Sequence, residues 1–416
     1  MNSMARRLLK SVRHRQTAWL RSSPARSGKQ HLGKLVLGIE TSCDDTGAAV
    51  VDDAGRVLGE ALHCQKEIHL QAGGIIPVVA QQLHRENIKQ VVEEALSVSG
   101  VSVHQLAAIA TTVKPGLALS LEVGLQYSLN LVSRYQKPFI PIHHMEAHAL
   151  TVRLTQHLEF PFLVLLLSGG HCILAVAQGV SDFLLLGQSI DIAPGDMLDK
   201  VARRLSLRKH PECQSMAGGK AIEHLARGGS WQQLSFPLPM QQHRNCLFSF
   251  SGLQNLVNKA IVQKEREEGI EEGEILSCAQ DIAAAAQHAV AVHIIQRTYR
   301  AMLFCIKNGI LPSKSATLVV SGGVASNQYI RRGLQALADV NDFAFLCPPP
   351  RLCTDNGVMI AWNGIERLRA GVGVLRDTDG IRYQPKAPLG IDISKRVEED
   401  SIRVPKLKKK IRWLAP

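Results

Sequence analysis

Two histidines four residues apart, His144 and His148, are the side chains of this sequence that most directly suggest chemistry at a metal ion. They follow the apolar run 139–142, so a helix that begins after this run would carry both imidazoles on one face. Asp355, far downstream, would add a third ligand and leave one coordination position open, as catalytic metal sites do. The same spacing also fits two exposed or core histidines, so the pattern alone leaves both interpretations open.

Glu146 argues against a zinc peptidase of the usual type. Those enzymes carry His-Glu-x-x-His, with the glutamate next to the first histidine. Glu146 instead lies midway between the two histidines, at a different angle around the helix axis. It is therefore poorly placed to polarise a metal-bound water.

Two segments, 36–51 and 163–177, share one plan: an apolar strand, a turn of small polar residues and a second apolar strand. A third strand is expected after each of them, at 56–64 and at 183–190. Either turn alone could be an ordinary hairpin, but two in matched positions predict an internal duplication. Turns of Gly, Ser and Thr also expose backbone N–H groups that suit phosphate oxygens.

A third loop, 319–327, leaves an apolar strand and enters a helix through a Gly-Gly pair. Two glycines before a helix N-terminus allow the close approach of a nucleotide. Together, the three loops resemble the plan of the actin, sugar-kinase and heat-shock chaperone ATPase superfamily. The expected fold is therefore α/β, with two duplicated lobes and a nucleotide cleft between them.

Nine short motifs in one order make the resemblance more specific. The chain resembles the tRNA threonylcarbamoyladenosine transferase family, once described as O-sialoglycoprotein endopeptidases, over residues 35–390. The motifs are Gly-Ile-Glu-Thr-Ser-Cys-Asp (38–44), Gly-Gly-x-x-Pro (73–77), Pro-Gly-Leu (115–117), His-x-Glu-x-His (144–148), Leu-Ser-Gly-Gly-His (167–171), Asp-Lys-Val-Ala (199–202), Phe-Ser-Phe-Ser-Gly-Leu (248–253), Ser-Gly-Gly-Val-Ala-Ser-Asn (321–327) and Cys-Thr-Asp-Asn-Gly (353–357).

The resemblance implies roles for particular residues. His144, His148 and Asp355 would hold one divalent metal ion per subunit, and a mixed His and carboxylate set suits zinc or iron. The residues that would contact the substrate fall in four groups: Leu166, Leu167, Ser168, Gly169 and Gly170 in the adenylate loop, Asp199, Gly219 and Glu223 on the nucleoside side, Ser326 and Asn327 in the adenosine loop, and Thr354 beside the metal aspartate.

The resemblance also implies an activity. A threonylcarbamoyl group would pass from threonylcarbamoyl-AMP, made by a separate synthase, to the exocyclic amine of the adenosine 3′ of the anticodon in tRNA. A homodimer is the expected assembly. Asp45 is the candidate proton acceptor, although it could equally cap its own turn. A metallopeptidase and an ATP-binding kinase or chaperone-like protein remain the alternative classes.

The chain departs from the family pattern at four places. Segment 77–84 lacks the family's glutamate and arginine, Lys114 replaces a glycine, Gln254 and Asn255 replace Lys-Thr, and 207–218 lacks Tyr-Pro-Gly-Gly-Pro. The last change makes Gly219 and Glu223 the binding residues that the motifs support least. Such variants resemble the mitochondrial branch of the family.

The N-terminus fits that branch independently. Residues 1–34 contain nine Lys or Arg, frequent serines and no Asp or Glu, which is typical of a mitochondrial transit peptide. A basic arm that contacts RNA is the alternative. We expect a transit peptide at 1–34 and a location in the mitochondrial matrix.

Charge is unevenly distributed along the chain. Of the net +12, residues 1–34 supply +9 and residues 395–416 supply +5, so residues 35–394 sum to −2. The lobes are therefore not generally basic, and RNA affinity would have to come from local patches or from the tail 406–413. A solvated end is an equally good interpretation of that tail.

Composition bounds the remaining features. We expect lobe one at 35–150, lobe two at 151–365 and a C-terminal segment with a basic tail at 366–416. The nine cysteines form no Cys-x-x-Cys pair and predict free thiols. No apolar run reaches the length of a membrane span.

Overall fold

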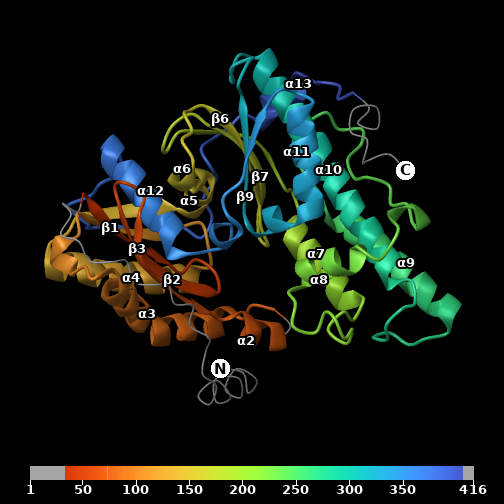
Figure 1. Ribbon diagram of the computed structural model, residues 1–416, viewed down its shortest axis with the longest axis horizontal. Coiled ribbons are helices and arrows are strands. Elements are labelled where there is room, and N and C mark those ends of the chain that lie inside the picture. The colour runs from red at the N-terminus through yellow and green to blue at the C-terminus, as the bar shows by residue number, and fades with distance from the viewer. Residues whose placement is uncertain (1–32, 73, 406–416) are drawn as a thin grey trace. The chain divides into compact units, whose positions relative to one another are not determined.

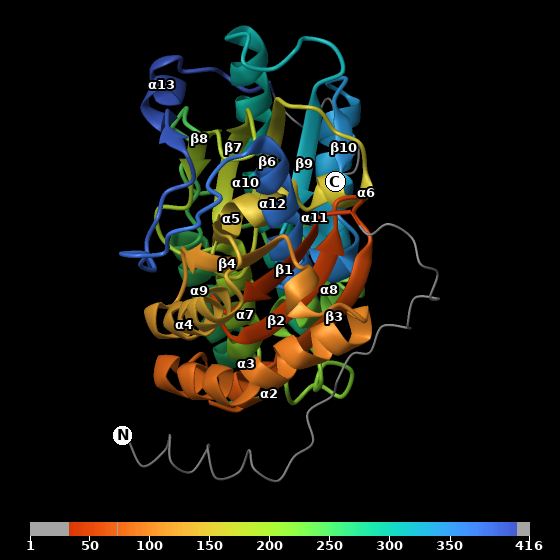
Figure 2. The same ribbon diagram turned by 90° about the vertical axis from the view of Figure 1, so that its left-hand side faces the viewer.

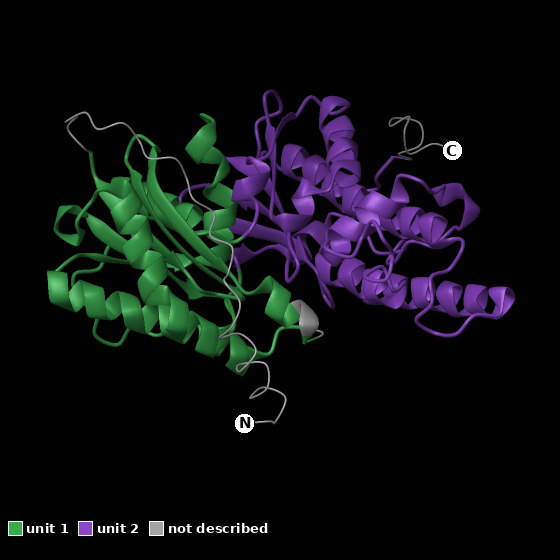
Figure 3. Cartoon of the chain, turned by 60° about the horizontal axis from the view of Figure 1, so that its bottom comes forward, with its two compact units in different colours: residues 1–158, 355–388 green, residues 159–354, 389–416 purple. Residues whose placement is uncertain are grey.

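The computed structural model describes residues 33–72 and 74–405, which form two compact units. Unit 1 comprises the chain up to Leu158 together with Asp355–Pro388, and unit 2 comprises Glu159–Thr354 together with the chain from Leu389 onward (Figure 3). Nearly all of the expected transit peptide and the basic tail from residue 406 lie outside the described residues.

Unit 1 is built on a five-stranded sheet in the order β3-β2-β1-β4-β5. Strands β1 (Leu35–Glu40), β2 (Asp45–Asp52) and β3 (Val57–Cys64) run antiparallel, while β4 (Ala108–Lys114) and β5 (Phe139–His143) continue the sheet in parallel with β1. Every residue of β1 is buried, as expected of a strand covered on both faces. The predicted hairpin at 36–51 and the third strand at 56–64 are confirmed.

Helices cover both faces of this sheet (Figures 1 and 2). Helices α3 (Pro77–Ser99) and α4 (Ala118–Tyr135) pack side by side on one face, and α12 (Gly357–Ala370) packs on the other against β1 and β2. Helix α5 (His144–Leu150) follows β5 directly and packs against α12. The shorter elements of unit 1 are α2 (Lys66–Gln71), η1 (Val103–Gln105) and α6 (Val152–Thr155).

Unit 2 repeats the plan. Strands β6 (Phe162–Leu167), β7 (Cys172–Ala177) and β8 (Phe183–Gln188) run antiparallel, and β9 (Thr317–Ser321) and β10 (Ala344–Leu346) extend the sheet in parallel with β6. The order β10-β9-β6-β7-β8 corresponds strand for strand to that of unit 1, and β11 (Ile391–Asp392) adds a sixth strand beside β8. The predicted duplication is confirmed.

The core of unit 2 is organised by α10 (Ala279–Lys307), most of whose residues are buried. Helices α8 (Gly218–Ala226) and α11 (Gln328–Asp339) pack on it, as does η2 (Trp231–Gln233). Helix α7 (Pro194–Arg204) packs between α8 and α9 (Ser251–Glu268), and α9 ends before Gly269, which adopts a left-handed conformation (φ 66°). The remaining elements are η3 (Gly323–Ser326), η4 (Pro350–Leu352) and α13 (Ser394–Glu399).

The unit boundaries differ from the predicted lobe boundaries. The sequence placed residues 151–365 in lobe two, with C-terminal segments that could fold back onto lobe one. The structure assigns Asp355–Pro388 to unit 1, since α12 packs on β1 and β2, and returns the chain to unit 2 at Leu389, where β11 pairs with β8.

Three glycines let α12 approach the sheet closely. A Cβ atom on Gly38 would lie 2.2 Å from the Ala361 backbone nitrogen, and one on Gly357 would lie 2.4 Å from the Ala48 backbone. A Cβ on Gly47 would in turn lie 2.8 Å from the Gly357 nitrogen. Side chains at these positions would push α12 away, so the glycines determine where the residues before α12 lie.

Two simpler expectations concern the part of the chain that is described. All nine cysteines are free thiols, as predicted. No helix within 33–72 or 74–405 combines the length and apolar content that a membrane span requires.

Candidate metal centre and nucleotide loops

His144, His148 and Asp355 come together in unit 1. The ligand atoms of the three side chains lie within 4.8 Å of one another. The Asp355 Oδ1 atom is 3.1 Å from the His148 Nε2 atom and 3.5 Å from the His144 Nε2 atom. Ligands of a tetrahedral zinc ion lie about 3.4 Å apart, because its bonds are about 2.1 Å long. The donor set and its spacing therefore fit a divalent metal ion.

Local structure explains how these side chains are placed. The His143 side chain caps α5 by accepting a hydrogen bond from the Met145 amide (3.2 Å), so His144 is the first residue of that helix. Asn356 caps α12 in the same way through the Met359 amide (2.9 Å). Asp355, the residue before this cap, is therefore fixed where α12 meets the sheet.

A buried network holds the far side of the His144 ring. The His144 Nδ1 atom lies 3.1 Å from the Glu40 Oε2 atom and 3.1 Å from the Ser42 Oγ atom. Glu40 is fully buried at the end of β1, and it also accepts hydrogen bonds from the Ser42 amide and the Thr112 hydroxyl, both at 2.5 Å. A carboxylate on the second nitrogen of a metal-binding histidine fixes its tautomer and its orientation.

The electrostatics of the site favour a cation. Burial disfavours a charged His144, but Asp355 and Glu40 outweigh burial and raise its pKa to about 10. Burial likewise raises the pKa of Asp355, but His144 and His148 outweigh it and hold that pKa well below its usual range. A divalent metal ion can supply the positive charge that the two carboxylates stabilise.

Sequence reasoning missed Glu40, Ser42 and Thr112 as supports of the metal site. A signal was present, because Glu40 is an ionisable residue at the end of an otherwise apolar strand. Nothing in the spacing, however, connects Glu40 with a histidine 104 residues downstream.

Glu146 is engaged elsewhere, as its position between the histidines suggested. Its Oε2 atom lies 2.5 Å from a guanidinium nitrogen of Arg367 on α12, and both side chains are buried. Burial raises the pKa of Glu146, while Arg367 acts in the opposite direction. Glu146 thus ties α5 to α12 instead of facing the metal ligands.

Asp45, the candidate proton acceptor, begins β2 opposite Cys64. Its Oδ1 atom is buried and has no hydrogen-bond partner among the described residues. Burial, together with the neighbouring Asp44, raises the pKa of Asp45 to about 7. A carboxylate with this pKa can take up a proton near neutral pH.

The predicted adenylate loop of unit 2 connects β6 and β7. Of the backbone amides of Ser168, Gly169 and Gly170, two donate hydrogen bonds within the turn itself. The Ser168 amide donates to the His171 carbonyl (2.8 Å), and the Gly170 amide donates to the Ser168 hydroxyl (3.3 Å). Gly169 and Gly170 face open space. Leu166 and Leu167 are buried strand residues whose backbone pairs with β7.

Other elements of unit 2 lie against this loop. A Cβ atom on Gly195, in the first turn of α7, would lie 2.8 Å from the Gly169 Cα atom. Gly322 has a φ of 97°, and a Cβ there would lie 2.3 Å from the Leu167 carbonyl oxygen. The hairpin, the start of α7 and the Gly-Gly loop therefore converge at the end of β6, as the nucleotide-binding prediction requires.

The predicted nucleoside residues connect three helices of unit 2. The Asp199 Oδ1 atom on α7 accepts a hydrogen bond from the Gly219 amide on α8 (2.7 Å). The Glu223 Oε1 atom on α8 accepts one from the Gln328 amide at the start of α11 (2.7 Å). These carboxylates brace α7, α8 and α11 in the structure.

The adenosine-loop residues also have structural partners. The Asn327 side chain caps α11 by accepting from the Tyr329 and Ile330 amides, and it donates to the Gln287 side chain (3.0 Å). The Ser326 hydroxyl donates to the Gly323 carbonyl (2.6 Å). Thr354 is exposed next to Asp355 in the sequence. Substrate contact by these residues remains a prediction.

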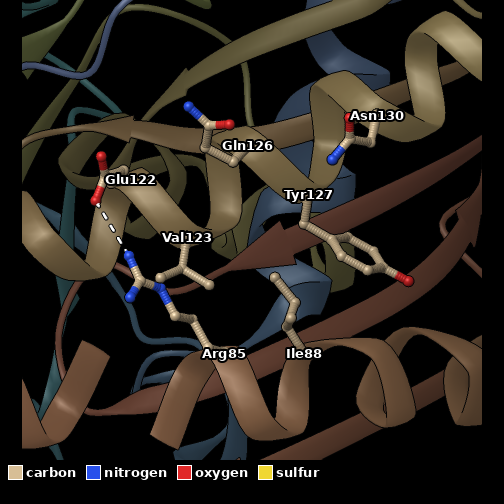
Figure 4. Close-up of a pocket in the computed structure, with 7 residues that line it drawn as sticks. All are labelled: Arg85, Ile88, Glu122, Val123, Gln126, Tyr127 and Asn130. Atoms are coloured by element: carbon tan, nitrogen blue, oxygen red, sulfur yellow. Dashed lines mark ion pairs between the residues drawn. The ribbon is translucent and has the colours of Figure 1, made fainter. Parts of the chain in front are cut away.

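A separate groove of about 470 Å³ lies between α3 and α4 of unit 1 (Figure 4). Across it the Arg85 guanidinium approaches the Glu122 carboxylate at 3.8 Å. The metal-ligand cluster contributes no residue to its lining, which consists of Arg85, Ile88, Glu122, Val123, Gln126, Tyr127 and Asn130. We assign the groove no role in catalysis.

Comparison with known sequences agrees with the motifs. The model of the family described as tRNA N6-adenosine threonylcarbamoyltransferase matches residues 56–362. The chain is 66% identical to the mitochondrial tRNA N6-adenosine threonylcarbamoyltransferase of Homo sapiens, covering 94% of this chain and 95% of that protein. It is 41% identical to the tRNA N6-adenosine threonylcarbamoyltransferase of Rhodospirillum rubrum, covering 86% of this chain and 96% of that protein.

Comparison with solved structures concerns the fold alone. The crystal structure of HypF from T. kodakarensis matches with a TM-score of 0.51 and 16% sequence identity, covering 82% of this chain and 48% of that chain. With the matched strand orders of the two sheets, this likeness confirms the predicted α/β fold of two duplicated units.

Glu40→Gln is expected to weaken zinc binding roughly 10–100-fold, because His144 loses the carboxylate that orients its ring. Affinity is measured by competition with a chelator, and the unfolding midpoint is recorded in parallel. Glu146→Gln is the matched control, because it removes a buried glutamate from α5 itself. It should leave zinc affinity unchanged but lower stability by about 3–5 kcal/mol, since Arg367 loses its partner. Equal losses of affinity in both variants would contradict this description of the site.

Proposed function

Because this chain belongs to the tRNA N6-adenosine threonylcarbamoyltransferase family, we propose that its donor is threonylcarbamoyl-AMP and its acceptor a mitochondrial tRNA. The family activity is an acyl transfer to tRNA. The acceptor atom would be the exocyclic nitrogen of the adenosine 3′ of the anticodon, in tRNAs that read codons beginning with A. The observation that carries the proposal is that the family match at 56–362 encloses the whole metal-ligand cluster.

The proposed step forms one bond and breaks one. The lone pair of the adenosine nitrogen attacks the carbonyl carbon of the donor, and a new nitrogen–carbon bond forms. The bond from that carbon to the phosphate oxygen breaks, so AMP leaves with the electron pair. The attacking nitrogen then has one proton to lose.

The chain's own groups suit parts of this step. His144, His148 and Asp355 would hold a divalent ion, which when bound supplies a Lewis acid for a carbonyl or phosphate oxygen. Glu40 keeps the His144 ring in position for that ion. In unit 2, the open side of Gly169 and Gly170 would receive the adenylate phosphate. Asp45 would take the proton from the attacking nitrogen.

A metallopeptidase is a weaker interpretation of the same ligands. It would need a carboxylate beside the metal-bound water, and Glu146, the acid between the two histidines, is paired with Arg367. A peptidase would also leave the predicted nucleotide loops without a role.

The cellular setting also belongs to the proposal. Relatives from several animals are named mitochondrial, and residues 1–34 have the composition of a transit peptide, so we place the protein in the mitochondrial matrix. A synthase elsewhere in the pathway would supply the donor, because the adenylate must be made before it can be transferred. The homodimer stays a prediction, which sedimentation of the purified chain would test.

The direct test supplies labelled threonylcarbamoyl-AMP and a mitochondrial tRNA to the purified chain. Label should appear in tRNA and AMP should be released in equal amount, and His148→Ala should abolish both. Parallel reactions with ATP alone and with a peptide test the other two classes. Hydrolysis of ATP or of the peptide, with no label in tRNA, would overturn the proposal.

Asp45 should determine the acid side of the pH profile of transfer. If its carboxylate accepts the proton, the rate should rise as the pH passes about 7, because the ionised form is active. Asp45→Asn should remove this limb and lower the rate roughly 10²–10⁴-fold. Asp44→Asn is the matched control: Asp44 raises the pKa of Asp45, so its loss should move the limb to lower pH. A limb near pH 7 that persists in Asp45→Asn would assign the proton to another group.

Removal of residues 1–34 should separate location from catalysis. The truncated chain should transfer threonylcarbamoyl at the normal rate in vitro, because no motif residue is lost. In cells it should stay outside mitochondria, as fluorescence microscopy and fractionation can measure. Import of the truncated chain into the matrix would refute the transit-peptide interpretation.

A further inference from the structure

Three arginines of unit 2 lie on or against the loop 240–246: Arg244, Arg297 and Arg300. The guanidinium group of each approaches backbone carbonyl oxygens. The Arg297 guanidinium donates to the carbonyls of Met240, His243 and Asn245. The Arg300 guanidinium donates to the carbonyls of Asn245 (2.8 Å) and Ile402 (3.0 Å). Arg244, on the loop itself, approaches the Ser401 carbonyl at 3.4 Å. None of the three forms an ion pair with a carboxylate among residues 33–405.

This arrangement leaves positive charge uncompensated. Arg297 and Arg300 are only 2% and 7% exposed, and the carbonyl oxygens that accept their hydrogen bonds do not neutralise their charge. Burial lowers the pKa of Arg297 to about 10, and repulsion by Arg300 acts in the same direction. The Arg297 Nε atom is also buried without a hydrogen-bond partner in the described part of the chain.

Another arginine of the same unit shows the more usual solution. Arg204 on α7 forms two 2.6 Å hydrogen bonds to the carboxylate of Glu265 on α9. Among the described residues, Arg297 and Arg300 thus differ from Arg204 in having no carboxylate hydrogen-bonded to them.

The acids nearest to the loop are occupied by other groups. Asp400 pairs with Lys307 (3.2 Å) and accepts from the Asn308 amide, and Glu398 accepts from the Asn245 amide (3.2 Å). These contacts tie α13 to loop 240–246 and Asp400 to the end of α10, and the next cation along the chain, Arg403, is exposed. The sequence beyond Pro405 adds five more cations and no acid.

Residues 395–405 hold three Lys or Arg and three acids, so their net charge is zero, and the net +5 of residues 395–416 comes from the sequence beyond Pro405, outside the described residues. Arg244 and Arg403 are exposed cations of the described surface. A partner that recognises this surface must carry repeated negative charge. The acceptor in the proposed reaction is a polyanion with one charge per nucleotide, and no other substrate in the reaction is comparable.

We propose that Arg244, Arg297, Arg300 and Arg403, here called the arginine patch, form a docking surface for the phosphate backbone of RNA. Exposed Arg244 and Arg403 contact phosphates, and the buried pair beneath them adds an unneutralised field. The patch belongs to unit 2 and shares no residue with the predicted donor contacts, so it serves acceptor binding. This inference rests on the proposed function, because that function supplies the RNA.

The test is a salt titration of tRNA binding by the full chain. Each lost phosphate contact should make the slope of log affinity against log salt shallower by about 0.7–0.9. Arg244→Gln with Arg403→Gln should therefore reduce the slope by about 1.4–1.8. Arg244→Lys with Arg403→Lys should keep most of it, because charge is retained. The matched control, Lys259→Gln with Arg266→Gln on α9, removes the same charge from exposed positions in the same unit and should change the slope little.

A chain that ends at Pro405 separates the patch from the tail. The glutamine pair should still reduce the slope in this background. An unaltered slope there, or an equal reduction in the Lys259 and Arg266 control, would overturn the patch. Transfer from labelled donor by the unaltered chain is measured separately, and its absence would overturn the proposed function. If transfer occurs but the glutamine pair and the unaltered chain give the same salt slope, the arginine patch alone is refuted.

Discussion

The close approach of α12 to the first sheet is the constraint on which the metal site depends. Asp355 lies 207 residues beyond His148, and it reaches the histidines only because α12 returns to unit 1. Gly38, Gly47 and Gly357 make that return possible, since a Cβ atom at any of them would meet backbone at 2.8 Å or less. Close backbone packing, which these glycines permit because they have no side chains, thus brings Asp355 to the two histidines.

The second requirement is the balance of charge around His144. Glu40 and Asp355 approach opposite nitrogens of the same ring, so the buried carboxylate of Glu40 and the half-buried one of Asp355 share one imidazole. Such an arrangement is unfavourable without a cation and favourable with one, which explains why a buried strand end carries a glutamate. The charge of Glu146, by contrast, is balanced within the protein. Glu146 pairs with Arg367 and so stabilises the junction of α5 and α12 instead of facing the metal ligands.

The same comparison distinguishes the arginines of unit 2. Arg204 is neutralised by Glu265 and braces α7 against α9, which is a structural role. Arg297 and Arg300 donate to carbonyl oxygens and pair with no carboxylate of the described residues. They therefore hold loop 240–246 in place while their positive charge is not neutralised. The metal site and the arginine patch share one feature. The carboxylates of the first and the arginines of the second are not fully neutralised by the described residues, and in each case we propose a bound ligand as the partner.

Local sequence determined much of this protein. Alternating apolar runs and small polar turns predicted both hairpins, and the spacing of His144 and His148 predicted their shared helix face. The motifs then supplied Asp355. Tertiary structure alone decided that α12 belongs to unit 1, that Glu40 supports His144, and that the Ser168 amide closes its own turn. It also showed that Asn327 caps α11 and that Arg297 pairs with no carboxylate of the described residues. A helix or hairpin is specified by neighbours along the chain, whereas a charge partner or a close backbone contact is specified by whichever distant residue folding brings within a few ångströms, and no periodicity records that choice.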